Sequence, residues 1–160
     1  MVGKISEVSS LERTAVHEAG HSSACVLLRV EVLEARIDFA DGESKVTYIP
    51  SPNPVDTILV AAAGAAAESL AFGSSSELTG TDERNADRAA FAARGGISTA
   101  DHLVRRCRAE VRELLFDRWD AVEAVALALL ECRWPADLGF AFGSLSGREV
   151  ADLVAGASGG

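Results

Sequence analysis

Apolar residues recur every three or four positions along most of this chain, and this spacing predicts amphipathic helices. The first helix should begin after Ser9, which forms a capping-box pattern with Glu12, and should run to about Leu28. Asp56 can cap a second helix over residues 57–72, where a run of Ala and Gly allows a neighbouring helix to pack at short distance. A short third helix should end at the glycine pair 95–96.

The second half of the chain predicts the longest helix. Ser98 and Asp101 repeat the capping-box pattern, and the apolar stripe that follows extends from Val104 to Leu129. Arg and Glu side chains cover the other face, so one face should be buried and the other solvated. A last capping-box pattern, at residues 146–149, should start a helix that runs through about residue 154.

Residues 32–39 and 45–49 have the pattern of a β-hairpin. Both stretches contain β-branched residues, they flank Asp41-Gly42, and three prolines in residues 50–54 end the second. The chain shows no internal repeat and no long linker. We therefore expect one domain over residues 1–156 and a flexible tail over residues 157–160. The expected fold class is α+β and mostly helical, with a small hairpin sheet and a long C-terminal amphipathic helix.

Composition and charge exclude several classes of partner. The formal net charge of −9 argues against nucleic acid and against an anionic membrane surface. The longest apolar run, residues 58–67, has about half the length that a bilayer-spanning helix needs. Because the start of the chain also lacks the apolar region of a secretory signal, we expect a cytoplasmic protein without a membrane span.

The cysteines and tryptophans have simple structural interpretations. The three cysteines are far apart and odd in number, so reduced buried thiols are expected rather than a disulfide framework or a metal knuckle. Cys25 lies one helical turn beyond His21 and is expected in the core rather than at a metal. Trp119 and Trp134 are expected as core or contact aromatics.

The segment at residues 17–21, with the HExxH pattern, carries the main chemical signal. Residues four apart lie on one face of a helix, so His17 and His21 can bind a single ion through their imidazoles. Glu18 lies beside this pair and can act as the general base that removes a proton from a metal-bound water. The pattern therefore predicts one Zn²⁺ per chain, on the predicted first helix and beside the small sheet.

A third metal ligand must come from elsewhere in the chain. The acidic candidates are Glu68, on the alanine-rich helix, and Asp82, just before the third helix. His102 is a further candidate, but it lies near a helix start with arginines beyond it, where a solvated role is commoner.

The order of four segments resembles the peptidase domain of the FtsH family of zinc metallopeptidases (M41). These segments are the HEAGH at 17–21, the alanine-rich helix ending in Phe-Gly at 63–73, the turn at 79–82 with Ala86, and the close at 145–150. The resemblance covers nearly the whole chain. It implies that Asp82 is the third ligand, with Glu68 as the second candidate for that position. In the favoured arrangement, Glu68 orients a ligand histidine instead. A plainer role for Glu68 is capping or pairing with an arginine.

Two departures from the family pattern limit what the resemblance implies. Family members usually carry an ATPase motor and a membrane anchor, whereas this chain contains no GxxxxGK[ST] phosphate-binding loop. Asp82 is also followed by a charged pair, Glu83-Arg84, where the family usually has an apolar residue.

The expected function is that of a stand-alone zinc metalloendopeptidase. It should hydrolyse peptide bonds in flexible or unfolded polypeptides without ATP, with a separate ATPase in trans as one expected partner and a homo-oligomer left open. The alternative is a zinc-stabilised binding or regulatory module, derived from such a peptidase, that has no catalytic activity. The intact Glu18 favours the enzyme, because a purely structural metal site does not need a base.

Overall fold

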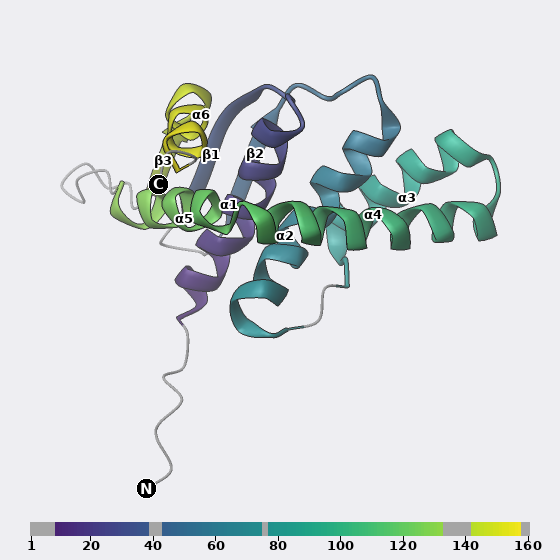
Figure 1. The fold of residues 1–160 in the computed structure, drawn as a ribbon, viewed down its shortest axis with the longest axis horizontal. Coiled ribbons are helices and arrows are strands. Elements are labelled where there is room, and N and C mark those ends of the chain that lie inside the picture. Colours follow the sequence, from purple (N-terminus) through teal and green to yellow (C-terminus); the bar gives the residue numbers. More distant parts are fainter. Residues whose placement is uncertain (1–8, 39–42, 75–76, 133–141, 158–160) are drawn as a thin grey trace, which may run out of the picture.

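The computed structural model describes residues 9–38, 43–74, 77–132 and 142–157. These ranges form six helices and three strands, which follow one another along the chain as Figure 1 is labelled. They are α1 (Ser10–Leu27), β1 (Val32–Asp38), β2 (Ser44–Tyr48), α2 (Pro54–Phe72), α3 (Gly80–Arg94), α4 (Ile97–Asp117), α5 (Trp119–Glu131), β3 (Phe142–Ser146) and α6 (Gly147–Gly156). The strands form one antiparallel sheet in the order β2-β1-β3. The mostly helical α+β class is therefore confirmed.

Two of the predicted capping boxes are present. In α1 the Ser9 hydroxyl accepts a hydrogen bond from the Glu12 backbone N–H at 3.1 Å, and the Glu12 carboxylate accepts one from the Ser9 backbone N–H at 2.9 Å. In α6 Ser146 and Glu149 form the same reciprocal pair. Each box satisfies two backbone donors that the first turn of a helix leaves without intrahelical partners.

The small sheet is larger than the sequence predicts. The two hairpin strands pair as expected, although the predicted turn around Asp41-Gly42 lies outside the described residues. The third strand, β3, was not predicted, and it pairs with the other edge of β1 from Glu34↔Ser146 to Asp38↔Phe142. Its five residues are FGSLS, and such a short segment of small and polar residues has no clear strand signal.

The second helix begins earlier than predicted. Its cap is Asn53, whose side-chain oxygen accepts a hydrogen bond from the Val55 backbone N–H at 3.1 Å, and Pro54 occupies the first turn. Proline is well suited to this position because the first N–H groups of a helix have no intrahelical partner. Asp56, the predicted cap, lies inside the first turn and accepts a hydrogen bond from the Ser51 hydroxyl at 2.6 Å.

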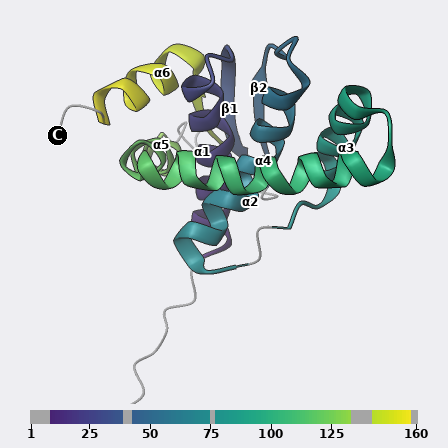
Figure 2. The ribbon, with the colours of Figure 1, turned by 45° about the vertical axis from the view of Figure 1, so that its right-hand side comes forward.

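The predicted long helix is two helices. The expected box at Ser98 and Asp101 was wrong, because α4 already starts at Ile97 after Gly96 and has no side-chain cap. The helical path breaks at Arg118, with φ −127° and ψ 36°, and Figure 2 shows α5 turning away from the direction of α4. The apolar stripe stays buried across the break, and no Pro or Gly marks it, so periodicity alone could not reveal it.

Helices α1 and α2 pack against each other with almost no side chain between them. A Cβ added at Gly20 of α1 would lie 2.6 Å from the Ala63 carbonyl oxygen and 2.7 Å from the Ala67 Cβ of α2. By length and composition α2 could cross a membrane, but its residues from Ile58 to Ala67 are buried inside the fold. The core helix of a folded domain has the same length and apolar composition, because it too is surrounded by apolar side chains.

Gly147→Ala should destabilise the fold by about 1–3 kcal/mol, because a Cβ there would overlap the Val32 carbonyl of β1, and backbone cannot move aside as a side chain does. The matched control is Gly156→Ala at the other end of α6, where an added Cβ meets nothing within 4 Å. Urea unfolding midpoints of the two variants and the wild type measure the difference. Equal midpoints for the two variants would contradict the close approach of α6 to β1.

Candidate metal centre

His17 and His21 lie one turn apart on α1 and face the same space. Their Nε2 atoms are 3.0 Å apart, and the rings meet edge to face with centroids 4.7 Å apart. Two imidazole nitrogens this close, each with a lone pair available, can bind one ion together. The i, i+4 spacing of the HExxH segment accounts for this placement.

Asp82 comes to the same point from a different element. It was predicted to lie just before the third helix, but α3 begins at Gly80, so Asp82 lies in its first turn. Its Oδ2 is 3.3 Å from His17 Nε2 and 3.2 Å from His21 Nε2. The three donor atoms are thus close enough to hold a metal ion. Bonds of about 2.0–2.1 Å in a tetrahedral zinc site place neighbouring ligand atoms about 3.3–3.4 Å apart, so the observed triangle fits.

The space in front of the two histidines is kept open by Gly64 of α2. A Cβ added there would lie 2.5 Å from His17 Nε2 and 2.6 Å from His21 Nε2. Any other residue at this position would therefore press on the two Nε2 atoms that would face a bound ion. The absence of a side chain at Gly64 is a second observation, independent of the donor set, that fits a metal.

The other ring nitrogens of both histidines are held by α2. His17 Nδ1 lies 2.7 Å from Glu68 Oε1, and the second Glu68 oxygen accepts a hydrogen bond from Arg13 at 3.0 Å. His21 Nδ1 lies 2.7 Å from the Val60 carbonyl oxygen, which can only accept, so Nδ1 carries the proton. This tautomer leaves Nε2 free to bind a metal. Glu68 therefore both orients a histidine and pairs with an arginine.

The electrostatic potential is negative around the cluster of His17, His21 and Asp82, as the shifted pKa values of this group indicate. Burial alone lowers the pKa of His17, but the carboxylates of Asp82, Glu18 and Glu68 outweigh it and raise the pKa to about 9. Burial raises the pKa of Asp82, and hydrogen bonds to His17 and His21 overcome this, so that the pKa ends well below its usual range. The cluster thus favours a positive charge at its centre.

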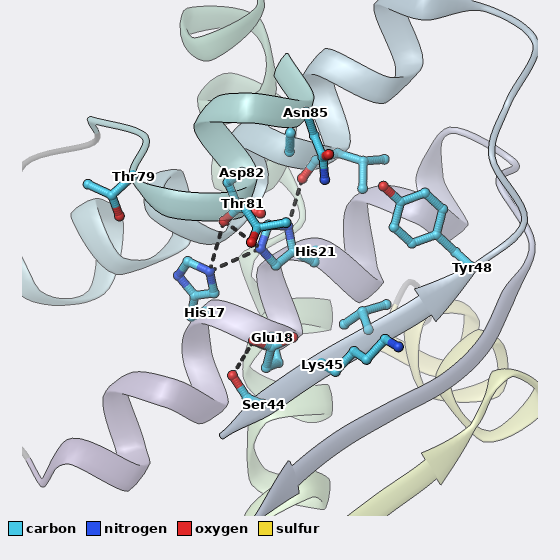
Figure 3. A pocket seen from close by; sticks show the side chains of 13 residues that line it. His17, Glu18, His21, Ser44, Lys45, Tyr48, Thr79, Thr81, Asp82 and Asn85 are labelled. Atoms are coloured by element: carbon cyan, nitrogen blue, oxygen red, sulfur yellow. Dashed lines mark hydrogen bonds and ion pairs between the residues drawn. The ribbon is translucent and has the colours of Figure 1, made fainter. Parts of the chain in front are cut away.

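The cluster opens into a cleft of about 620 Å³. Glu18 lines the same cleft but is not part of the three-residue donor group, and it is almost fully buried. The Ser44 hydroxyl, at the start of β2, donates a hydrogen bond of 2.5 Å to Glu18 Oε1 (Figure 3). The cleft is lined by His17, Glu18, His21, Ser44, Lys45, Val46, Tyr48, Val60, Ala61, Thr79, Thr81, Asp82 and Asn85.

Other residues considered from the sequence lie elsewhere. His102 is exposed on α4 and lines a separate cavity with three arginines. Cys25 is buried outside the donor group, and burial raises the pKa of its thiol to about 12, which keeps it protonated. Trp119 packs against the core as expected, whereas Trp134 lies outside the described residues.

The sequence did not reveal several residues that shape this site. Gly64 is one small residue within a run of small residues, and nothing in that run singles it out. Ser44 and Tyr48 belong to the predicted second strand, and Asn85 lies one turn beyond Asp82 on α3. Alternation along residues 44–48 would place Ser44 and Tyr48 on one face, but only the folded chain shows that this face is the cleft.

Gly64→Ala should weaken zinc binding by about 10–100-fold, the range found when groups that orient metal ligands are lost. The added methyl group would displace the ends of two side chains, which can move, so the metal-free fold should survive. Zinc affinity is measured by competition with a chromophoric chelator, and circular dichroism of the metal-free variant serves as the control. Unchanged zinc affinity in the variant would show that the ion does not bind in front of Gly64.

Asp82→Asn should weaken zinc binding far more than Glu68→Gln. The first change removes an anionic oxygen that contacts both Nε2 atoms, whereas the second alters only the partner of His17 Nδ1, at an expected cost of about 10–100-fold. The same chelator competition compares the two variants. If Glu68→Gln were the more damaging change, Glu68 rather than Asp82 would be the third ligand.

Neither the protein-family models nor the curated proteins that were compared with this sequence give a match. The donor group of His17, His21 and Asp82 shares its cleft with Glu18.

Proposed function

We propose that this chain is a zinc-dependent endopeptidase that hydrolyses peptide bonds in flexible or unfolded polypeptides. One observation carries the proposal more than any other. A buried carboxylate, Glu18, shares the cleft with a three-residue donor group without belonging to that group. A metal site that served only structure would have no use for such a carboxylate.

The donor set fits zinc. Two neutral imidazole nitrogens and one carboxylate oxygen are the ligand types that catalytic zinc sites combine, and three protein ligands leave a position for water or substrate. When bound there, zinc would lower the pKa of a water ligand to about 7 and polarise a carbonyl group. One ion per chain is expected, held by His17, His21 and Asp82.

Glu18 would move the proton. Ser44 holds Glu18 Oε1, and among the residues that the structure describes Oε2 has no hydrogen-bond partner. Oε2 is therefore the atom that would accept a proton from the attacking water and pass it to the leaving amine. The hydrogen bond from Ser44 fixes the rotation of the carboxylate, so that Oε2 stays directed at one place.

The sheet offers a place for an extended substrate. In the order β2-β1-β3, strand β2 is an edge, and four of its five residues line the cleft. A substrate segment could add to this edge as a further strand through main-chain hydrogen bonds. The backbone of a folded protein is not free to pair with such an edge, because unfolding that protein costs about 5–15 kcal/mol. Unfolded chains are therefore the expected substrates.

The resemblance to the FtsH-type peptidases supports the same proposal. Three of the four segments that carry the resemblance, residues 17–21, 63–73 and 79–82, supply the two histidines, Glu68 and Asp82. Because the sequence contains no phosphate-binding loop of the GxxxxGK[ST] type, hydrolysis by this chain should not depend on ATP. Folded substrates would need a separate ATPase that unfolds them.

Glu18→Gln should keep zinc and lose peptide hydrolysis by about 10²–10⁴-fold, the contribution expected of a general base. The amide has nearly the same shape but cannot accept the proton. The matched control is Glu83→Gln, an exposed residue next to Asp82 that does not line the cleft. Zinc content and cleavage of an unfolded fluorescent casein are measured for all three proteins.

Full activity of the Glu18→Gln variant would refute the proposed mechanism, and a wild type that binds no zinc would refute the site. A wild type that binds zinc and cleaves no peptide would instead indicate the zinc-stabilised binding module. Loss of activity in Glu83→Gln as well would show that the loss reflects charge near the cleft rather than the base.

A further inference from the structure

Strand β2 presents two hydroxyl groups to the cleft, at its two ends. Ser44, Val46 and Tyr48 line the cleft, as expected for alternate residues of a strand, and Lys45 lines it as well. Four residues of strand span about 13 Å between the Cα atoms of Ser44 and Tyr48. Figure 3 shows the metal-binding group between the two ends, with Glu18 on the side of Ser44. One end of the strand is therefore already paired with the base.

The hydroxyl at the other end of the strand belongs to Tyr48. Among the described residues no hydrogen bond is made by the Tyr48 hydroxyl, and the same is true of the Asn85 side chain. In Figure 3 the Tyr48 ring enters the cleft with its hydroxyl directed toward Asn85, on the side away from Glu18. The Tyr48 hydroxyl is not among the buried polar atoms that lack a partner, so it is open to the cleft, where an acceptor atom of a ligand could take its hydrogen bond.

We propose that Tyr48, with Asn85 beside it, binds the oxygen of the substrate carbonyl and stabilises the negative charge that develops there during hydrolysis. This inference rests on the proposed peptidase function. Attack by water on the carbonyl carbon moves an electron pair onto the carbonyl oxygen. A donor fixed in advance at that position lowers the barrier, because its hydrogen bond strengthens as the charge grows.

Tyr48 is suited to remain a donor. Burial and the nearby Asp82 carboxylate are among the causes that raise the pKa of its phenol, so the hydroxyl keeps its proton at neutral pH. Glu18 takes the proton of the water and returns it to the leaving amine, so Tyr48 neither gains nor loses a proton in the reaction. The base, Glu18, and the hydrogen-bond donor, Tyr48, would thus lie on opposite sides of the cleft.

The backbone beside Tyr48 is irregular in a way that fits this role. The pairing of β1 with β2 shifts between Val32 and Glu34, so that β1 has one extra residue, Leu33, opposite Thr47 and Tyr48. Bulges of this kind increase the local twist and re-aim neighbouring side chains, and they are common next to active sites. The ladder resumes beyond the bulge, where the Ile49 N–H donates to the Glu31 carbonyl at 2.9 Å.

Tyr48→Phe tests the proposal because it removes a single oxygen. We expect kcat to fall by about 10²–10³-fold with KM and zinc affinity unchanged, as for the loss of one oxyanion donor. Binding of a phosphonamidate peptide, whose anionic oxygens imitate the developing charge, should weaken by about the same factor as kcat/KM. The matched control is Thr47→Val, which removes a hydroxyl from the neighbouring residue of β2, a residue that does not line the cleft.

The outcomes separate this inference from the peptidase proposal. If the wild type hydrolyses peptide and Tyr48→Phe stays within about threefold of it in kcat and in phosphonamidate binding, the donor role is wrong and the peptidase stands. If the wild type hydrolyses nothing, the peptidase proposal fails, and calorimetry with the zinc-loaded proteins decides the rest. Binding that is at least about tenfold weaker in Tyr48→Phe would support Tyr48 as a donor to an anionic oxygen of a bound ligand, without the part in hydrolysis. Equal binding, or none to either protein, refutes it.

Discussion

Helices α1 and α2 approach each other until backbone meets backbone, and the arrangement of the candidate metal ligands depends on that approach. Gly20 removes the side chain where α1 meets Ala63 and Ala67, and Gly64 removes it where α2 faces the two histidines. At this distance one helix can hold the other's imidazoles, through Val60 and Glu68. A wider spacing would leave the Nδ1 atoms of both histidines to water, and the rings would lose their fixed orientation.

The approach also explains the composition of α2. Ten consecutive residues of this helix, Ile58 to Ala67, are buried, and seven of them are Ala or Gly. A helix in the middle of the fold has neighbours on several sides, and here α1, α3 and α4 all contact it. Small residues let several helices come close, but each contributes little apolar area. Larger buried side chains from α4, α5 and β1, such as Leu115, Leu129 and Ile37, supply the rest of the core.

The sequence predicts the features that depend on local spacing. The capping boxes of α1 and α6, the two strands of the hairpin and the shared face of His17 and His21 all follow from patterns within a few residues. The position of Asp82 beside them came from a resemblance, because spacing alone left Glu68 and His102 open. The break at Arg118 left no local signal, since the stripe of apolar residues continues through it and no Gly or Pro stands there.

Contacts between distant segments account for most of what the sequence did not show. Ser44 is 26 residues from Glu18, and Glu68 is 51 residues from His17. β3 became a strand because it pairs with β1, although its own residues have little strand preference. Tertiary pairing of this kind is decided by the whole fold, and a single sequence contains no direct record of it.

The position of β2 at the edge of the sheet has a consequence for how the chain tolerates change. Successive residues of a strand point to opposite faces, so a shift of β2 by one residue against β1 would turn Ser44 and Tyr48 away from the cleft together. A shift in one direction would put Lys45 and Ile49 in their places, and a shift in the other direction would put Glu43 and Thr47 there. In either case the phenol of Tyr48 would no longer lie in the cleft with His17, His21 and Asp82. The bulge at Leu33 also depends on the register, because the extra residue lies opposite Thr47 and Tyr48 only in the observed pairing of β1 with β2. An insertion or deletion of a single residue within β2 would therefore change which of its side chains face the cleft. His17, His21 and Asp82 would stay in place, because they lie on α1 and α3.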